Sequence, residues 1–379
     1  DKQDESCLTL NVWTPARARH APVLVWLHGG AWRTGATSMP LMDGQALAGQ
    51  GLVVVTVNYR LGSTGFLSHP AFTDPDSGLA GNWCLQDQAA ALAWVRDNIE
   101  AFGGDPASVC VIGQSAGATN AALLAQHPEW SRLLHKAVLL SPAGIAAPLG
   151  FSEGDAAAYT ELVAASLGTS PQGLMAVPAA KLHAAELAVN RQALPASFTS
   201  GHVFRAAPVQ DGRSVRGDWT RMAWPEGIPL MVTNTLTEGS FFADLYDPVA
   251  QKSLTAPLPQ SREALAALVA GPGLAGSPAG ADAVIEAYAK AALAEARVAT
   301  PGALYVEIYG DRLLRNFSAR FADRVAGQGG QVYLGTYMHE LQRPGQGVPH
   351  CAEVPMLFST YALDYYRSKL GAGPAEQRV

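Results

Sequence analysis

The sequence predicts an α/β protein whose central sheet is mostly parallel and flanked by helices. Two patterns favour this class. Short apolar runs, rich in β-branched residues, alternate with longer segments of helical composition through the first 140 residues, and this alternation is typical of parallel sheets wrapped on both sides by helices. Around residue 115, an apolar strand passes through a glycine-rich turn into a helix, which is a unit from which such sheets are built.

The first three predicted strands lie before residue 58. Leu8–Trp13 alternates apolar with polar side chains, and Pro15 ends it because proline cannot donate to the hydrogen bonds of a sheet. Val23–Leu27 and Leu52–Val57 are apolar runs of strand length, well short of the roughly 18 residues that a membrane-spanning helix needs.

A helix is expected to open at Gly81–Cys84 and to end at Gly103-Gly104, because its apolar residues fall on one helical face. These are Leu85, Ala89, Leu92, Val95 and Ile99. Asp105-Pro106 should then turn the chain into the strand around Val109–Ile112. A helix over Ala118–Gln126 and a strand over Ala137–Leu140 follow.

Two alanine-rich blocks without strand patterns interrupt the second half of the chain, at about 149–200 and 251–300. Strand-like runs resume at Pro229–Thr233 and Gln331–Met338. We therefore predict one domain over residues 1–379, in which the two blocks are helical insertions that cap the sheet.

Composition excludes several classes of function. Hydrophobic residues make up 48% of the chain and charged residues 15%, with a net charge of −6 and no basic cluster, so no nucleic-acid partner is expected. The four cysteines are widely spaced and form no CxxC pair, so no zinc site is expected. We predict neither a metal nor a cofactor. The chain begins without the apolar core of a signal peptide, which favours a cytoplasmic location.

Gly113-Gln114-Ser115-Ala116-Gly117 has the pattern of a nucleophile elbow. The turn between strand and helix is so sharp that the neighbours of the serine must lack bulk, which two glycines satisfy. It exposes the Ser115 hydroxyl and leaves the N–H of Ala116 at a helix start, where negative charge is favoured. His28-Gly29-Gly30-Ala31-Trp32, after an earlier strand, can present further N–H groups, as in an oxyanion hole.

Longer motifs resemble the type-B carboxylesterases of the α/β-hydrolase fold, the family that includes the cholinesterases. The segments that carry the resemblance are CLTLNVW (7–13), HGGAWRTG (28–35), NYRLGSTGFL (58–67), GNWCLQDQ (81–88), 94–118, PVQDG (208–212), TEGSFF (237–242) and GVPHCAEVPMLF (347–358). Family members usually extend further at both ends, so the chain looks truncated relative to them.

The resemblance implies a catalytic triad of Ser115 as nucleophile, Glu238 as acid and His350 as base. It also implies an oxyanion hole formed by the N–H groups of Gly30, Ala31 and Ala116. Independently of the resemblance, nucleophilic catalysis by serine requires these residue types, because a serine hydroxyl needs an imidazole to accept its proton. The imidazole in turn needs a carboxylate to fix its tautomer.

Other residues compete for these roles. Asp211 and Glu340 are alternative acids, although an Asp-Gly turn is usually structural and Glu340 resembles a solvated loop charge. His339 is an alternative base, and His28 is expected to brace its loop. Trp32 either lines the acyl side of the substrate pocket or anchors the loop by packing.

The chain departs from the family pattern at several positions. Gln114 stands where the family most often has a glutamate, and loss of that carboxylate should lower the basicity of the histidine. Cys84 and Cys351 replace usual glycines. Secreted members of the family pair the cysteine that corresponds to Cys7 with an upstream cysteine. This sequence has none, so the resemblance implies that Cys7 is unpaired within the chain.

The leading hypothesis is a serine esterase that acts on a small-molecule carboxylic ester through an acyl-enzyme on Ser115. The alternative is a non-catalytic binding module with the cholinesterase fold, because fold alone does not determine chemistry. The natural ester and the oligomeric state are not indicated by the sequence.

Overall fold

The computed structural model describes residues 4–142, 152–191, 206–243, 246–247, 252–253, 257–271, 280–340 and 347–363. Parts of both predicted insertions, namely 149–151, 192–200, 251, 254–256 and 272–279, lie outside the described residues.

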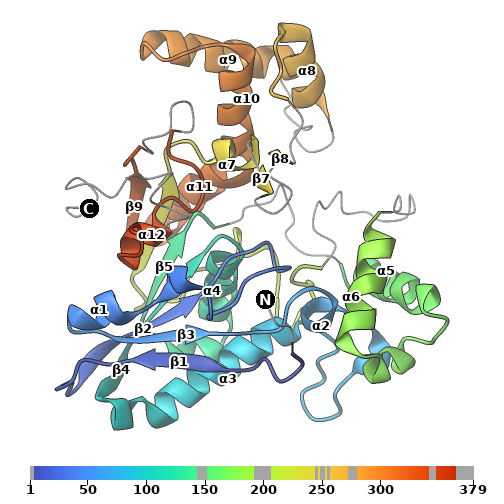
Figure 1. Ribbon diagram of the computed structural model, residues 1–379, viewed down its shortest axis with the longest axis vertical. Helices are drawn as coiled ribbons and strands as arrows, with labels where there is room; N and C mark the ends of the chain where they lie inside the picture. Colours follow the sequence, from blue (N-terminus) through green and yellow to red (C-terminus); the bar gives the residue numbers. More distant parts are fainter. Residues whose placement is uncertain are drawn as a thin grey trace.

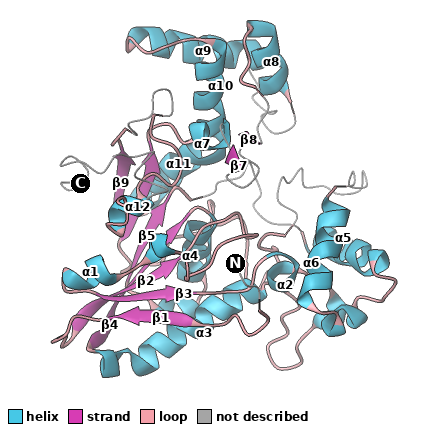
Figure 2. Ribbon diagram, viewed as in Figure 1, coloured by secondary structure: helices cyan, strands magenta, loops and turns pink. Residues whose placement is uncertain are grey.

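A seven-stranded sheet in the order β1-β3-β2-β4-β5-β6-β9 forms the centre of the molecule (Figures 1 and 2). Only β1 runs antiparallel to its neighbour, and the other pairs are parallel. This confirms the predicted fold class. The strands are β1 (Leu10–Trp13), β2 (Ala21–Leu27), β3 (Val53–Val57), β4 (Gly104–Gln114), β5 (Lys136–Leu140), β6 (Leu230–Thr235) and β9 (Val332–Tyr337). A separate pair consists of β7 (Tyr246–Asp247) and β8 (Lys252–Ser253).

Alternate residues of the central strands point to opposite faces, and both faces are covered. Val25 and Val111 face the larger core, which α3, α4 and α11 complete. Trp26 and Ile112, one position later, face a smaller cluster with residues of α1 and α12. The period of two along a strand produces these two layers. Those helices are α1 (Gln45–Gly49), α3 (Trp83–Asn98), α4 (Ala116–Gln126), α11 (Asn316–Gly327) and α12 (Val354–Leu357).

The first alanine-rich block folds as α5 (Glu153–Ser166) and α6 (Ala179–Asn190), which pack together beside α2 (Gly62–Phe66) around Tyr159, Val163 and Leu182. The buried carboxylate of Glu186 accepts a hydrogen bond from the Ser63 N–H. This block therefore lies against the loop that follows β3 (Figure 1).

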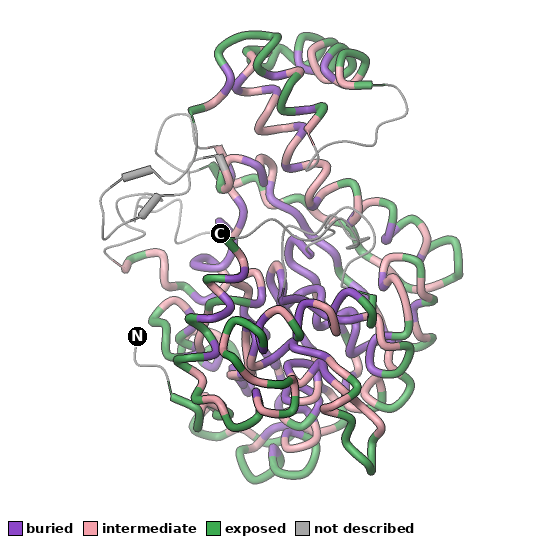
Figure 3. Tube along the Cα trace, turned by 90° about the vertical axis from the view of Figure 1, so that its right-hand side faces the viewer, coloured by how far each residue is buried: buried purple, intermediate pink, exposed green. Residues whose placement is uncertain are grey.

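The second block folds as α8 (Arg262–Ala270) and α9 (Gly280–Ala294), which share a small core with α10 (Pro301–Gly310). A π-helical turn joins α10 to α11, and α7 (Gly239–Ala243) packs on α10. Helices α8, α9 and α10 project from the sheet (Figure 1). Buried positions are sparser there than in the body built on the sheet (Figure 3).

The expected turn at Asp105-Pro106 is wrong. Both residues lie inside β4, which begins at Gly104, and the pairing of β4 with β2 shifts register between Ala21 and Val23. A proline is tolerated in a strand where the ladder is irregular, because no N–H is needed at that position.

Candidate active site

The carboxyl ends of four neighbouring parallel strands bring together polar side chains from distant parts of the chain. Ser115 follows β4, Ser141 follows β5, Glu238 follows β6 and His350 follows β9. Parallel strands end at a common edge, and the crevice outside that edge is where ligands of such sheets bind. Topology therefore gathers residues that the sequence separates by more than 200 positions.

The turn at Ser115 depends on the absence of side chains around it. Ser115 itself has a φ of 56°, which is unfavourable for a residue with a Cβ. A Cβ on Gly113 would lie 2.2 Å from the Gly117 carbonyl oxygen, and one on Gly117 would lie 2.2 Å from that of Leu27. The Ser115 N–H donates to the Leu140 carbonyl at 2.8 Å, which holds this strained turn against β5.

The loop after β2 packs directly on this turn. A Cβ on Gly29 would lie 3.1 Å from the Ser115 Cβ, and Gly30 and Ala31 both have positive φ, at 113° and 54°. Within the described residues, the N–H groups of Gly30, Ala31 and Ala116 donate no hydrogen bond to protein atoms. These unpaired donors can therefore serve an incoming anion.

Glu238 is held by a full set of hydrogen bonds in a buried position, 1% exposed. Its Oε2 lies 2.7 Å from His350 Nδ1. Its Oε1 accepts from Ser141 Oγ at 2.6 Å, from the Thr235 N–H at 2.8 Å and from Asn234 Nδ2 at 3.0 Å. One oxygen is thus saturated by three donors, and the other is left for the imidazole.

His350 is 4% exposed, and its two ring nitrogens lie within hydrogen-bonding distance of the side chains of Glu238 and Gln114. Because its Nδ1 faces a carboxylate, the proton of the neutral ring belongs on Nδ1 and Nε2 is an acceptor. The side-chain amide of Gln114 lies there, with its Nε2 3.1 Å from His350 Nε2. Among the described residues, no hydrogen bond joins the Ser115 hydroxyl to His350. Such contacts are often long before substrate binds.

The acid and the histidine perturb each other. Burial raises the pKa of Glu238, but the charge and hydrogen bond of His350, with those of Ser141 and Asn234, outweigh it and lower that pKa below its usual value. Burial lowers the pKa of His350, whereas Cys351 and Glu238 beside it raise it, and the net direction is well upward. Such a pair favours a carboxylate facing an imidazole that readily accepts a proton.

Glu353 is a second buried carboxyl group near the pair. Neither of its oxygens has a hydrogen-bond partner among the described residues. Burial, with the nearby charge of Glu238, raises its pKa to about 7, against a smaller opposing effect of His350. Glu353 is therefore largely neutral in mildly acidic solution and charged in mildly basic solution.

This pKa makes the stability of the fold depend on pH. An ordinary glutamate has a pKa near 4.5, so between about pH 4.5 and pH 7 the folded state holds a proton that the unfolded state has lost. The contribution of Glu353 to the free energy of unfolding should therefore fall as pH rises through this range, by up to about 3 kcal/mol. We expect Glu353→Gln to remove this fall, as measured by urea unfolding at pH 5 and pH 8.

Glu100→Gln, at an exposed glutamate, is the matched control and should keep the wild-type dependence on pH. If the wild type and Glu353→Gln lose the same stability between the two pH values, Glu353 does not carry the raised pKa.

The competing acids and base lie in other settings. Asp211 accepts hydrogen bonds from the N–H of Val215 at 2.8 Å and from Ser214 Oγ at 2.5 Å, so it closes its own turn. Glu340 is exposed, and the His339 ring lies 6.5 Å from that of Tyr337. Within the described residues, none of these three is hydrogen-bonded to Glu238 or His350.

His28 and Trp32 both support the loop after β2. The His28 ring stacks on Tyr59 at 4.2 Å, and burial lowers its pKa to about 4. Trp32 is 1% exposed, donates from Nε1 to Asn120 Oδ1 at 2.8 Å and packs edge-on against Phe66. Of the two alternatives for Trp32, the structure favours the packing anchor.

Ser141 and Asn234 both donate hydrogen bonds to Glu238, and no sequence motif indicates this role for either residue. Both stand at the carboxyl ends of strands, Ser141 just after β5 and Asn234 within the end of β6. Their position at the strand ends could have indicated a role in the site, since polar residues at this edge of a parallel sheet face the ligand crevice.

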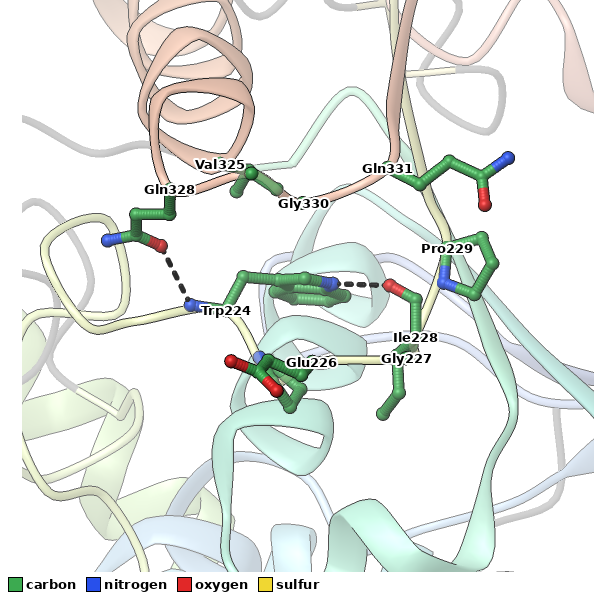
Figure 4. A pocket seen from close by; sticks show the side chains of 11 residues that line it. Trp224, Glu226, Gly227, Ile228, Pro229, Val325, Gln328, Gly330 and Gln331 are labelled. Carbon is green, nitrogen blue, oxygen red and sulfur yellow. Dashed lines mark hydrogen bonds between the residues drawn. The ribbon is translucent and has the colours of Figure 1, made fainter.

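A cavity of about 280 Å³ lies at the opposite edge of the sheet (Figure 4). It is bounded by the loop 224–229 before β6 and the loop 328–331 before β9. Trp224 crosses it, donating from Nε1 to the Ile228 carbonyl and from its N–H to Gln328 Oε1. None of the sequence-predicted site residues lines this cavity.

All four cysteines fall within the described part of the chain, and Cys7, Cys84, Cys110 and Cys351 are free thiols. In the same part, no group of three or more His, Cys, Asp or Glu side chains is arranged to hold a metal ion. Nor does any helix described there have the length and apolarity needed to span a membrane.

Comparison with known proteins identifies relatives of this chain. The sequence is 37% identical over 247 residues to fumonisin B1 esterase of Sphingopyxis macrogoltabida, covering 63% of this chain and 44% of that protein. It is 50% identical over 144 residues to para-nitrobenzyl esterase of Bacillus subtilis (strain 168), covering 38% and 29%. With human carboxylesterase 5A the identity is 48% over 145 residues, covering 37% and 24%. The matched region therefore spans less than half the length of each of these relatives.

The family match is more extensive than these pairwise ones. The model of the carboxylesterase family matches residues 1–370, and the seven-stranded, mostly parallel sheet flanked by helices is that of the α/β-hydrolase fold. This chain belongs to the carboxylesterase family.

Proposed function

We propose that this chain is a serine esterase that hydrolyses small-molecule carboxylic esters through an acyl-enzyme on Ser115. The observation that carries the proposal is the buried pair of Glu238 and His350, 2.7 Å apart, at the sheet edge where Ser115 occupies a strained turn. The relatives whose names describe them as esterases support the same class of reaction.

In the first half of the reaction, the Ser115 Oγ attacks the ester carbonyl carbon while its proton passes to His350 Nε2. Glu238 stabilises the imidazolium through the Nδ1–H. The carbonyl oxygen becomes an oxyanion, and the N–H groups of Gly30, Ala31 and Ala116 donate to it. In such sites, one donor is worth about 10²- to 10³-fold in rate. Collapse breaks the bond to the leaving oxygen, which takes the proton from Nε2 and departs as the alcohol.

In the second half, water takes the place of the alcohol. His350 Nε2 accepts one of its protons as the water oxygen attacks the acyl carbon, and the same N–H groups hold the second oxyanion. The bond to Ser115 Oγ then breaks, the proton returns to Oγ, and the carboxylic acid leaves. The enzyme ends in its starting protonation state.

Gln114 has to give up the hydrogen bond from its side-chain amide to His350 Nε2 during both halves of the reaction. Its amide donates to His350 Nε2 in the resting arrangement, at 3.1 Å, and Nε2 cannot accept from Ser115 or water along the same direction. Once Nε2 is protonated, the amide must present its oxygen or move aside. Being neutral, Gln114 also does less than a carboxylate would to raise the basicity of His350.

Covalent labelling with a fluorophosphonate tests the proposal. The Ser115 oxygen should displace fluoride from phosphorus, with its proton passing to His350, because the phosphonate mimics the tetrahedral intermediate. Intact-mass analysis should show a single adduct per chain, peptide mapping should place it on Ser115, and hydrolysis of nitrophenyl acetate should stop in proportion. A binding module predicts folded protein that takes up no label, and that outcome would contradict the esterase.

A further inference from the structure

A pair of hydrogen bonds joins the two loops that carry the acid and the base. The Val348 N–H donates to Thr237 Oγ1 at 2.7 Å, and the Thr237 N–H donates to the Val348 carbonyl at 3.1 Å. Thr237 directly precedes Glu238, and Val348 lies two residues before His350. Apart from the bond between Glu238 and His350, these are the hydrogen bonds between segments 235–240 and 347–353 in the described structure.

The chain between this pair and the imidazole is short and stiff. Only Pro349 separates Val348 from His350, and its ring fixes φ. Val348 is fully buried, so its side chain cannot move out into solvent. A displacement of Val348 is therefore passed almost directly to the His350 ring and to its 2.7 Å contact with Glu238.

Gly347 permits the close approach of the two loops. It has a φ of +55°, and a Cβ there would lie 2.5 Å from Thr237 Oγ1. Any larger residue would meet the very hydroxyl that receives the Val348 N–H. The glycine and the threonine are thus matched across the junction.

We propose that Thr237 is a positioning residue for the esterase reaction, whose hydroxyl holds the loop of His350 in register with Glu238. The role differs from those of Ser141 and Asn234, which hold the carboxylate of Glu238 itself. Thr237 instead sets where the base stands relative to the acid. The inference rests on the proposed function, but it also has a readout that does not need catalysis.

Thr237→Val, which keeps the shape and removes the hydroxyl, is the first test. We expect kcat for nitrophenyl acetate to fall about 10- to 100-fold, the loss typical of a misplacement near 1 Å, while KM changes less than about threefold because ground-state binding is untouched. Thr237→Ser restores the acceptor and should restore kcat. Thr73→Val removes an exposed hydroxyl whose one hydrogen bond within the described residues is to the Pro70 carbonyl, and it should leave kcat at the wild-type value.

The pH profile separates positioning from simple loss of stability. Burial lowers the pKa of His350, whereas Cys351 and Glu238 raise it, so a looser contact with Glu238 should move the acidic limb of kcat to lower pH. A merely structural role would lower the melting temperature and leave the limb in place. Gly347→Ala, which wedges the loops apart while keeping every hydrogen-bonding group, should shift the limb in the same direction.

Proton NMR supplies the readout that is independent of activity. The buried Nδ1–H of His350, held by a carboxylate, should resonate at low field in the wild type and in Thr237→Ser. It should move upfield or broaden in Thr237→Val. The inference would be overturned if folded Thr237→Val kept the wild-type kcat, the wild-type acidic limb of the pH profile and the wild-type Nδ1–H signal. That outcome would leave the esterase proposal intact. An inactive, unlabelled wild type would overturn the esterase proposal, and the NMR comparison would still decide the role of Thr237.

Discussion

Ser115→Ala should lower kcat for nitrophenyl acetate by about 10⁵-fold or more, to a residual rate that owes nothing to an acyl-enzyme. The variant removes the oxygen that we propose attacks the ester, and it leaves the rest of the site in place. Alanine fits the turn as well as serine does, since the Ser115 side chain forms no hydrogen bond among the described residues. The loss therefore reports chemistry and not folding.

The measurement is the rate of nitrophenyl acetate hydrolysis at a high concentration of the variant, together with the melting temperature of the variant. Ser131→Ala is the matched control, because in the part of the chain that the structure describes the Ser131 hydroxyl makes one long hydrogen bond, 3.4 Å, to the Pro128 carbonyl. That variant should hydrolyse the ester at the wild-type rate. Turnover by Ser115→Ala within tenfold of the wild type would assign the nucleophile to another residue.

Glu238→Gln should lower kcat by about 10³- to 10⁴-fold, the loss seen when a triad histidine takes the wrong tautomer. The structure gives the reason. Three donors, from Ser141, Asn234 and the Thr235 N–H, converge on Glu238 Oε1, so the single oxygen of a glutamine amide must stay there. Its NH₂ group then faces His350 Nδ1, which has to accept, and the ring proton moves to Nε2.

A ring protonated on Nε2 cannot take the proton of Ser115, so the variant should bind ester normally and react slowly. Glu186→Gln is the control, a buried glutamate that accepts from the Ser63 N–H away from the proposed triad. It should lower the melting temperature without a comparable loss in kcat. Nitrogen-15 chemical shifts of His350 would report the tautomer directly, and a ring still protonated on Nδ1 in Glu238→Gln would contradict this account.

Much of the fold could be predicted because its signals are local. Val53–Val57 is a strand in the structure almost as expected from its apolar run, and the α3 helix follows the predicted spacing of Leu85, Leu92 and Val95. The error at Asp105-Pro106 is also instructive. The local sequence Asp-Pro predicts a turn, and only the irregular pairing of β4 with β2 shows that this proline lies within a strand.

The sequence by itself determined the strained turn at Ser115, because a strand, two glycines and a helix are written in consecutive residues and sterics leave them few conformations. Tertiary structure alone decided which groups surround the proposed triad. The contact of Glu238 with His350 spans 112 residues, and the positions of Ser141, Gln114 and Thr237 beside it depend on how β4, β5, β6 and β9 are ordered and aligned. No local pattern encodes strand order, since it follows from the burial of the whole sheet and from loops that close over long distances.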